Sequence, residues 1–283
     1  MFGPQLKIII AVIAAGVLGA TLFGAYYLYQ KTYVPEQAAT QQIREYMTEP
    51  PPRPDPGKAQ FEQAMALLQS GELAAAHDKL LHLMRTYTDS SRYEDARRIV
   101  GEINVDLLFS PVRTPGKATY TVEPGDALAV IARRHNTTVS YIMRANARLG
   151  TTIHPGDKLM VCALDFTAVA ELGKKRLTLL RNGDFFKEYP IEGFELPFGV
   201  RAPFSAEVKN KTAWSEGSVT NFTKPDYNEA EKWIVLDKKG MVISPPPPED
   251  GKKRSLGGIY VSPEDSEELF TLLRDGASVK VVE

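Results

Sequence analysis

The stretch from Tyr120 to Val161 reads YTVEPGDALAVIARRHNTTVSYIMRANARLGTTIHPGDKLMV and is the most strongly patterned part of the chain. Leu128, Ile131 and Ala132 recur at helical spacing and mark the inner face of a helix that starts at about Ala127. We expect a small βααβ domain over residues 119–163. Its predicted elements are a strand at 120–122, a turn at 124–126, the first helix, a second helix capped by Thr138 or Ser140, and a strand after a turn at 154–157.

This stretch resembles the lysin motif (LysM) family along its full length. The likeness is carried by Y-T-V, the G-D-x-L turn, I-A in the first helix, Asn146 in the second helix, and I-x-P-G-D-x-L-x-V at the end. The resemblance implies a domain that binds N-acetylglucosamine-containing glycans, chiefly peptidoglycan, in a shallow groove between two loops. On this chain those loops are Gly125–Leu128 and Leu149–His154.

The resemblance also implies which residues contact the glycan. Backbone amides and small polar groups would bond to its acetamido and hydroxyl groups, while Leu128 and Ile153 would contact the apolar face of a sugar. Ala127 stands where many family members have threonine or serine, so weak binding is expected. For Gly125, Asp126 and Leu128 a role in folding the domain is expected as well. The candidate glycan-binding residues are Gly125, Asp126, Ala127, Leu128, Leu149, Ile153 and His154.

Residues 164–283 have the pattern of a mainly-β domain. FTAVAEL (166–172) and RLTLLR (176–181) alternate around a turn, and Asn182-Gly183 predicts a type I′ hairpin before FFKEYPI. Further strands are expected at 204–208 and 233–236. The region ends in SLGGIYVSPEDSEELFTLLRDGASVKVVE (255–283), in which a Gly-Gly turn precedes a helix and a strand.

This order resembles the catalytic domain of the L,D-transpeptidase family, which crosslinks peptidoglycan stem peptides through a cysteine thioester. The likeness is carried by LTLLRNGDFFKEYPI, LPFGVRAPFSAEV, and S-x-G-x-I with the helix and strand that follow it. The family signature S-H-G-C-x-R fails here, since glycine holds the nucleophile position, leucine the histidine position and tyrosine the arginine position. The degenerate positions are Ser255, Leu256, Gly257, Gly258 and Tyr260, with Ile259 between the last two.

Two functions remain open for this region. The family's other histidine should fall near Met241–Ser244, but the chain has no histidine after His154. Acyl transfer by this route needs a thiolate and a base, so we assign no catalytic residue and expect an inactive domain that binds stem peptide or acts as a scaffold. The alternative is an L,D-transpeptidase with displaced catalytic groups.

Composition narrows the classes of partner and cofactor. The 283 residues carry a net charge of -1 with dispersed lysine and arginine, so nucleic acid is not expected as a partner. The single cysteine, Cys162, excludes an internal disulfide, a cysteine-based zinc site and a CxxC redox pair, and its apolar setting predicts burial. We predict no metal and no cofactor. The helical and strand patterns together predict a multidomain α+β protein.

The first residues predict a membrane anchor. From Ile8 to Gln30 the sequence carries no charge, and such a helix would cover roughly 30 Å, the thickness of a bilayer core. We assign residues 1–31 to a single-pass anchor; a cleaved signal peptide is the alternative. Residues 32–58 end in EPPPRPDPG and predict a semi-rigid stalk. Because both recognised domains address peptidoglycan, the resemblance places residues 32–283 outside a bacterial inner or cytoplasmic membrane.

Residues 59–109 show apolar stripes typical of three short helices. Their pattern A-x-x-L-x-x-x-G-x-x-x-x-A resembles about one and a half tetratricopeptide repeats. Two interpretations remain open, namely a helical spacer that packs on its neighbours and a docking surface for a partner protein. His77 and His82 do not share a helical face and are expected to be solvated. A linker at 110–118 follows.

Overall fold

The computed structural model describes Gly19, residues 21–33, Thr40, Ile43, Arg44, and residues 55–112, 114–215, 217–222, 224–247 and 257–283. The chain divides into two units, Met1–Pro54 and Asp55–Glu283. In the first unit a described helical stretch ends in the π-helical turn η1, Tyr29–Tyr33. Among the described residues no helix is both long and apolar enough to cross a membrane. The predicted span from Ile8 to Gln30 is described only at Gly19 and residues 21–30, and most of the predicted stalk at 32–58 lies outside the described residues.

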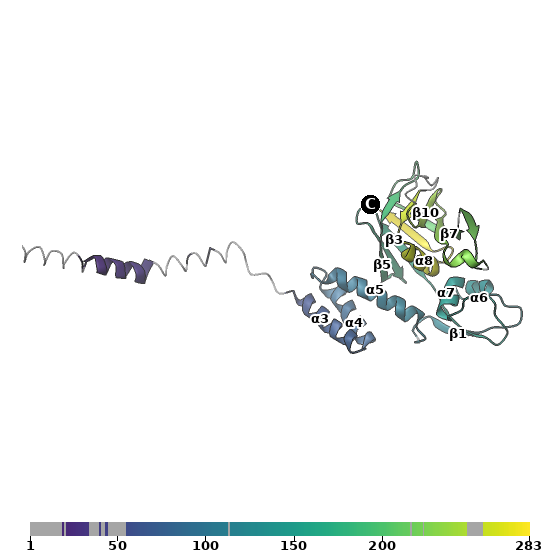
Figure 1. The fold of residues 1–283 in the computed structure, drawn as a ribbon, viewed down its shortest axis with the longest axis horizontal. Coiled ribbons are helices and arrows are strands. Elements are labelled where there is room, and N and C mark those ends of the chain that lie inside the picture. Colours follow the sequence, from purple (N-terminus) through teal and green to yellow (C-terminus); the bar gives the residue numbers. More distant parts are fainter. Residues whose placement is uncertain are drawn as a thin grey trace, which may run out of the picture. The chain divides into compact units, whose positions relative to one another are not determined.

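The second unit opens with three helices, α3 (Pro56–Gln69), α4 (Leu73–Thr86) and α5 (Tyr93–Phe109), which confirms the helical prediction for this region (Figure 1). Asp55 caps α3 by accepting a hydrogen bond from the Lys58 amide. It also accepts from the Ser91 hydroxyl just before α5, and chiefly this bond lowers the Asp55 pKa to about 2. The helical region therefore starts at Pro56, slightly before the expected boundary. Its likeness to tetratricopeptide repeats stays a prediction. The helices enclose a core of Ala64, Leu80, Leu83, Met84, Ala96, Val100 and Ile103.

The βααβ prediction for residues 119–163 is confirmed in its elements. The strand β1 (Lys117–Thr121) pairs antiparallel with β2 (Lys158–Cys162), and α6 (Leu128–Arg134) and α7 (Val139–Ala145) lie between them in sequence. Of the two capping residues considered, Thr138 caps α7, because its hydroxyl accepts a hydrogen bond from the Tyr141 amide at 3.0 Å. β1 begins at Lys117, inside the expected linker.

The rest of the second unit is built on a ten-stranded mixed sheet in the described residues. Its order is β5-β4-β3-β12-β7-β9-β10-β11-β6, with β8 paired to β7. The pairs β3 with β12 and β10 with β11 are parallel, and the other described pairs are antiparallel. The strands are β3 (Phe166–Glu171), β4 (Arg176–Arg181), β5 (Asp184–Pro190), β6 (Gly193–Glu195), β7 (Phe204–Ser215), β8 (Ser218–Thr220), β9 (Glu231–Leu236), β10 (Met241–Ser244), β11 (Gly257–Tyr260) and β12 (Ser278–Val282).

Two local predictions in this region are confirmed. Asn182 and Gly183 have φ of 53° and 90° between β4 and β5, the left-handed backbone that a type I′ turn requires at both central residues. A helix, α8 (Pro263–Leu272), follows β11 and precedes β12 as the sequence indicates. A short 3₁₀ helix, η2 (Pro225–Asn228), lies between β8 and β9.

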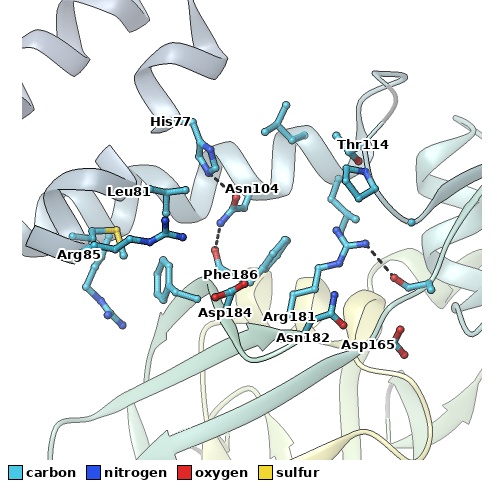
Figure 2. Close-up of a pocket in the computed structure, with 18 of the residues that line it drawn as sticks. His77, Leu81, Arg85, Asn104, Thr114, Asp165, Arg181, Asn182, Asp184 and Phe186 are labelled. Carbon is cyan, nitrogen blue, oxygen red and sulfur yellow. Dashed lines mark hydrogen bonds between the residues drawn. The ribbon is translucent and has the colours of Figure 1, made fainter. Parts of the chain in front are cut away.

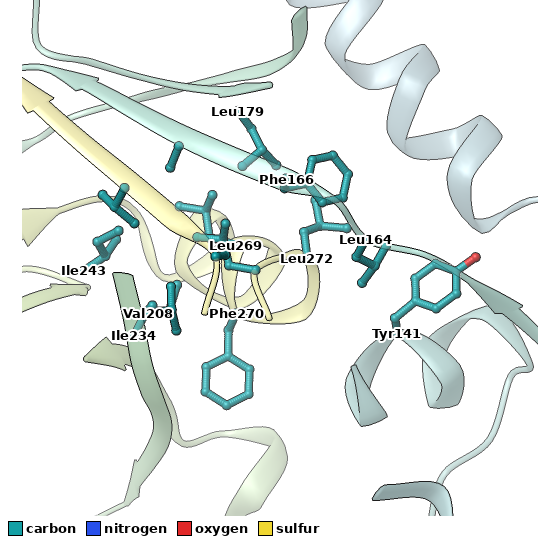
Figure 3. Close-up of a cluster of buried hydrophobic side chains, with 14 of the residues drawn as sticks. Tyr141, Leu164, Phe166, Leu179, Val208, Ile234, Ile243, Leu269, Phe270 and Leu272 are labelled. Atoms are coloured by element: carbon teal, nitrogen blue, oxygen red, sulfur yellow. The ribbon is translucent and has the colours of Figure 1, made fainter. Parts of the chain in front are cut away.

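One hydrophobic core joins the βααβ domain to the sheet. Leu164 and Tyr141 are fully buried in the same cluster as Leu269 and Leu272 of α8, and Figure 3 shows Leu164 lying between Tyr141 and the sheet residues. The Tyr141 hydroxyl donates a hydrogen bond to the Leu108 carbonyl at 3.0 Å. The two domains are therefore packed together rather than strung on a linker.

The helix α5 packs against β5. Its Asn104 side chain donates a hydrogen bond to the Phe186 carbonyl at 2.7 Å, and Lys187 of β5 pairs with Glu102 of α5 and with Glu268 of α8. A Cβ placed on Gly101 would lie 3.0 Å from Lys187 Cγ, so the two elements approach closely there. These contacts agree with the interpretation of the helices as a spacer that packs on its neighbours.

Candidate functional site

The turn at Pro124–Asp126 is held by the Asp126 carboxylate. Asp126 Oδ2 accepts hydrogen bonds from the Tyr120 hydroxyl at 2.6 Å and from the Glu123 amide at 2.9 Å, and these bonds hold the Asp126 pKa below its ordinary value. Gly125 supplies the φ of +89° that the turn requires, and it is exposed. The turn therefore presents its backbone to solvent in a fixed shape.

The turn at His154–Asp157 repeats this construction. Asp157 Oδ2 accepts from the His154 amide at 3.1 Å, as Asp126 Oδ2 does from the Glu123 amide, and Gly156 has a φ of +94°. The Val122 amide and carbonyl bond to Asp157 and Gly156, both at 2.8 Å, which ties the end of β1 to the second turn. The segment just before the first turn is therefore hydrogen-bonded to the second turn.

A shallow pocket of about 190 Å³ lies on the second predicted loop. Leu149 in its wall is 99% exposed, so its whole side chain is accessible beside the pocket. The Arg148 guanidinium bonds the Thr152 carbonyl and lies 3.4 Å from Asp157 Oδ2. The pocket is lined by Arg148, Leu149, Gly150 and Thr152.

The structure separates the predicted glycan-binding residues into two groups. Gly125, Ala127, Leu149 and His154 are exposed, and Asp126 is partly buried beneath its turn. Leu128 is only 2% exposed, and Ile153 is half-buried against the same hydrophobic core. The burial of Leu128 agrees with its expected place on the inner face of α6 and its role in folding the domain. It corrects the expected sugar contact, because the side chain is not accessible.

The Gly-Gly segment predicted as a turn is instead the strand β11, Gly257–Tyr260. It is buried along its length between β10, its parallel neighbour, and β6, its antiparallel neighbour. A Cβ on Gly257 would lie 2.4 Å from the Glu195 carbonyl oxygen, and one on Gly258 would lie 2.8 Å from the Val242 carbonyl oxygen. Two backbones therefore occupy the space that side chains would need. Ser255 and Leu256 lie outside the described residues.

The neighbouring strand β10 and the single cysteine are buried as well. β10, where the upstream histidine was sought, is buried at all four positions, and its Ser244 hydroxyl bonds the Pro245 carbonyl at 3.0 Å. Cys162 is 1% exposed, which confirms its predicted burial, and its Sγ accepts a hydrogen bond from Arg181 at 3.1 Å.

A cavity of about 720 Å³ lies between α4, α5 and the hairpin of β4 and β5 (Figure 2). His77 lines it with its side chain 17% exposed, and the ring bonds to Asn104, which in turn donates to the Phe186 carbonyl. This corrects the expectation that His77 is solvated, whereas His82 is exposed as expected. Arg181 in the same cavity donates to the Ala163 carbonyl. These polar groups are engaged with one another and with backbone, and they do not form a nucleophile and base pair.

Comparison with known proteins agrees with the two resemblances seen in the sequence. Residues 120–161 match the family model described as LysM domain. The chain is 24% identical to a Bacillus subtilis (strain 168) protein provisionally named L,D-transpeptidase YkuD. The aligned 172 residues make up 58% of this chain and 98% of that protein. On these similarities we call the two regions the LysM domain and the L,D-transpeptidase-like domain.

Solved structures with detectable similarity include L,D-transpeptidases from three bacteria. The Stackebrandtia nassauensis enzyme is 18% identical with a TM-score of 0.31, covering 42% of this chain and 56% of that one. Mycobacterium tuberculosis L,D-transpeptidase 1 is 14% identical with a TM-score of 0.29, covering 42% and 62%. An Enterococcus faecium L,D-transpeptidase is 17% identical with a TM-score of 0.28, covering 41% and 49%. This chain spans about half to three fifths of the length of these structures.

Three residues in or beside the second predicted loop were not among the predicted site residues, namely Arg148, Thr152 and Asp157. A signal for Asp157 was present, because Pro-Gly-Asp occurs at both 124–126 and 155–157 and the two aspartates make the same bond to their turns. Arg148 and Thr152 carried no local signal, since their contact with each other depends on the folded loop.

Proposed function

We propose that this protein is a membrane-anchored protein of the bacterial cell envelope that holds peptidoglycan through its LysM domain. The observation that carries the proposal is the pair of exposed turns, each braced by an aspartate, in the segment that matches the LysM model. Rigid turns present backbone donors and acceptors to a sugar at little entropic cost. The exposed Leu149 adds an apolar surface beside them.

We further propose that the L,D-transpeptidase-like domain serves as a scaffold or stem-peptide-binding module without acyl-transfer activity. By resemblance the nucleophile would stand at Gly258, where the Val242 carbonyl oxygen leaves no room for a Cβ. No histidine follows His154 to act as a base. Loss of a nucleophile in other acyl-transfer enzymes lowers the rate by about a million-fold.

The proposed location is a bacterial inner or cytoplasmic membrane, with one span near the start of the chain and residues 32–283 outside the cytoplasm. The uncharged segment 8–30 supports the span, and two domains similar to peptidoglycan-directed families support the orientation. A reporter enzyme that is active only after export from the cytoplasm should be active when fused after Glu283. Activity of a strictly cytoplasmic reporter there would reverse the proposed topology.

The function is tested by sedimenting the full chain, in mild detergent, with purified peptidoglycan. We expect the protein to pellet with the polymer, and Leu149→Asn to weaken this binding. Val112→Asn is the matched control, since Val112 is also an exposed aliphatic residue, at 57%, but lies outside the loops. Failure to sediment would refute glycan binding.

Mass spectrometry of the recovered peptidoglycan tests the absence of catalysis. We expect no new crosslinks and no covalent adduct on the protein. New crosslinks, or an acyl adduct on Cys162 or on a serine, would establish the alternative of a transpeptidase with displaced catalytic groups.

A further inference from the structure

A second cavity, of about 520 Å³, lies at the junction of the LysM domain and the transpeptidase-like sheet. We call it the junction pocket. Its walls come from α6 and the start of α7 on one side, and from β7 and the end of α8 on the other. Residues that define it are Arg133, Asn136, Lys211, Phe270, Arg274 and Asp275. Its volume lies in the range of small-molecule sites.

The junction pocket has an excess of positive charge. Arg133 comes from α6, Lys211 from β7 and Arg274 from the segment after α8. Asp275 is the single carboxylate in the lining, and Asp165, outside the lining, pairs with Arg274. Ala129, Ala132 and Phe222 give it apolar walls as well. This combination suits an anionic group carried on an apolar or peptide chain.

Lys211 is a partly buried cation of the pocket with few partners. Among the described residues, its Nζ has one hydrogen-bond acceptor, the Phe270 carbonyl at 2.6 Å, and it lies 4.7 Å from the centre of the Phe270 ring. Burial lowers its pKa to about 8, against a smaller opposing effect of Asp275. An ammonium group can donate three hydrogen bonds, so Lys211 retains capacity for an anionic partner.

The walls of the pocket are fixed to one another. The Thr138 hydroxyl of the LysM domain donates to the Thr271 carbonyl of α8 at 2.6 Å, and Arg274 contacts Asp165 at 3.4 Å. Arg274 Nε and Thr137 Oγ1 are buried without a hydrogen-bond partner in the described part of the chain. The pocket is thus a preformed site whose surroundings are short of acceptors.

The pocket also lies next to a proposed glycan loop. The loop Gly125–Leu128 leads directly into α6, and Ala129, Ala132 and Arg133 of the same helix line the pocket. At 1.5 Å per residue this seven-residue helix is about 10 Å long. A side branch of a glycan bound at the loop has only this distance to cover.

We propose that the junction pocket binds a carboxylate carried on a short peptide chain, with Lys211 as its main charged partner. Its source would be the stem peptide of the glycan strand held by the LysM loops, and this identification rests on the proposed function. The pocket would then distinguish peptide-bearing peptidoglycan from bare glycan. Arg133 at the rim would attract the carboxylate, and the apolar walls would receive its aliphatic part.

The test measures binding to the full chain, in detergent, by calorimetry with four probes. The probes are a disaccharide-tetrapeptide from peptidoglycan, the same compound with its carboxyl groups converted to amides, the free tetrapeptide, and a neutral N-acetylglucosamine oligomer. The variant is Lys211→Met, which keeps a similar length and removes a buried charge, so it is expected to fold. Lys209→Met on the same strand is the matched control, because Lys209 is exposed and does not line the pocket.

We expect Lys211→Met to weaken binding of the carboxylate form by about tenfold or more, to the level of the amidated form, and to leave the neutral oligomer unchanged. Lys209→Met should bind every probe as the unaltered protein does, and Arg133→Gln should weaken the carboxylate form by a few fold. If the free tetrapeptide binds as tightly as the glycan-linked form, the pocket still binds a peptide carboxylate, but its ligand need not be attached to the glycan strand.

Equal affinity of Lys211→Met and the unaltered protein for the carboxylate form would overturn the inference while glycan binding still stood. If the unaltered protein does not bind the neutral oligomer at all, the proposed glycan function is refuted instead. In that case a Lys211-dependent response to the free tetrapeptide alone would still support the pocket.

Discussion

The LysM turns and the strand β11 both depend on glycine, but for opposite reasons. Gly125 and Gly156 are exposed, have positive φ, and leave open space where a Cβ would stand. Gly257 and Gly258 are buried, and a Cβ on either would meet a neighbouring carbonyl oxygen within 3 Å. The first pair leaves two turns open to solvent, and the second pair lets a buried strand pass between two neighbouring backbones.

The largest expected effect tests the closure of β11. Gly257→Ala and Gly258→Cys should each lower the free energy of unfolding by more than ~3 kcal/mol, because backbone atoms must move to admit the new Cβ. Thermal and urea unfolding measure this effect. Gly150→Ala is the control and should change stability by less than ~0.5 kcal/mol, since nothing lies within 4 Å of its Cβ position. A Gly258→Cys protein of normal stability that forms an acyl adduct would break the comparison.

The second effect concerns Lys211, which lies where the two regions meet. Between about pH 8 and its ordinary value of 10.5 the folded protein has released this proton while the unfolded chain still binds it. The free energy of unfolding contributed by Lys211 should therefore rise across this window, by up to ~3 kcal/mol. Urea unfolding from pH 7.5 to 10.5 measures this rise. It should appear in the unaltered protein and in the control Lys209→Met, and it should be missing from Lys211→Met. Parallel pH profiles for all three would show that Lys211 is not perturbed.

A third effect tests how firmly the LysM domain is joined to the sheet. Thr138→Ala removes the cap of α7 and leaves the Thr271 carbonyl without its 2.6 Å bond, so we expect a loss of about 2 kcal/mol. Thr119→Ala, at an exposed position in β1, should stay within ~0.5 kcal/mol. Differential scanning calorimetry should show the two domains melting together. Two separate transitions in the unaltered protein would contradict a shared core.

The smallest effect on stability should come from the exposed leucine of the LysM loop. Leu149→Asn is expected to change the free energy of unfolding by less than ~0.5 kcal/mol while it weakens peptidoglycan binding. Leu128→Asn, at a buried position, should cost ~3 kcal/mol or more. Chemical unfolding and sedimentation on the same two variants separate surface from core. Equal loss of stability in both would show that Leu149 is not a free loop residue.

Local patterns predicted much of the fold because they report local physics. The Asn182-Gly183 hairpin, the Thr138 cap, the three helices and the βααβ order each depend on a few neighbouring residues. Burial was predicted less well. His77 was assigned to solvent and Leu128 to a sugar as well as to folding, yet both side chains are enclosed by packing against distant segments.

The sequence by itself determined the order of the elements, the two family resemblances, and the absence of cysteine and histidine from residues 164–283. Only the tertiary structure decided that β11 is closed and that a charged pocket lies between the domains. The closure requires Gly258 to meet Val242, and the pocket requires Lys211 to meet Phe270, which is 59 residues further along the chain. Contacts over such separations follow from how whole strands and helices pack, so no local pattern of residues encodes them.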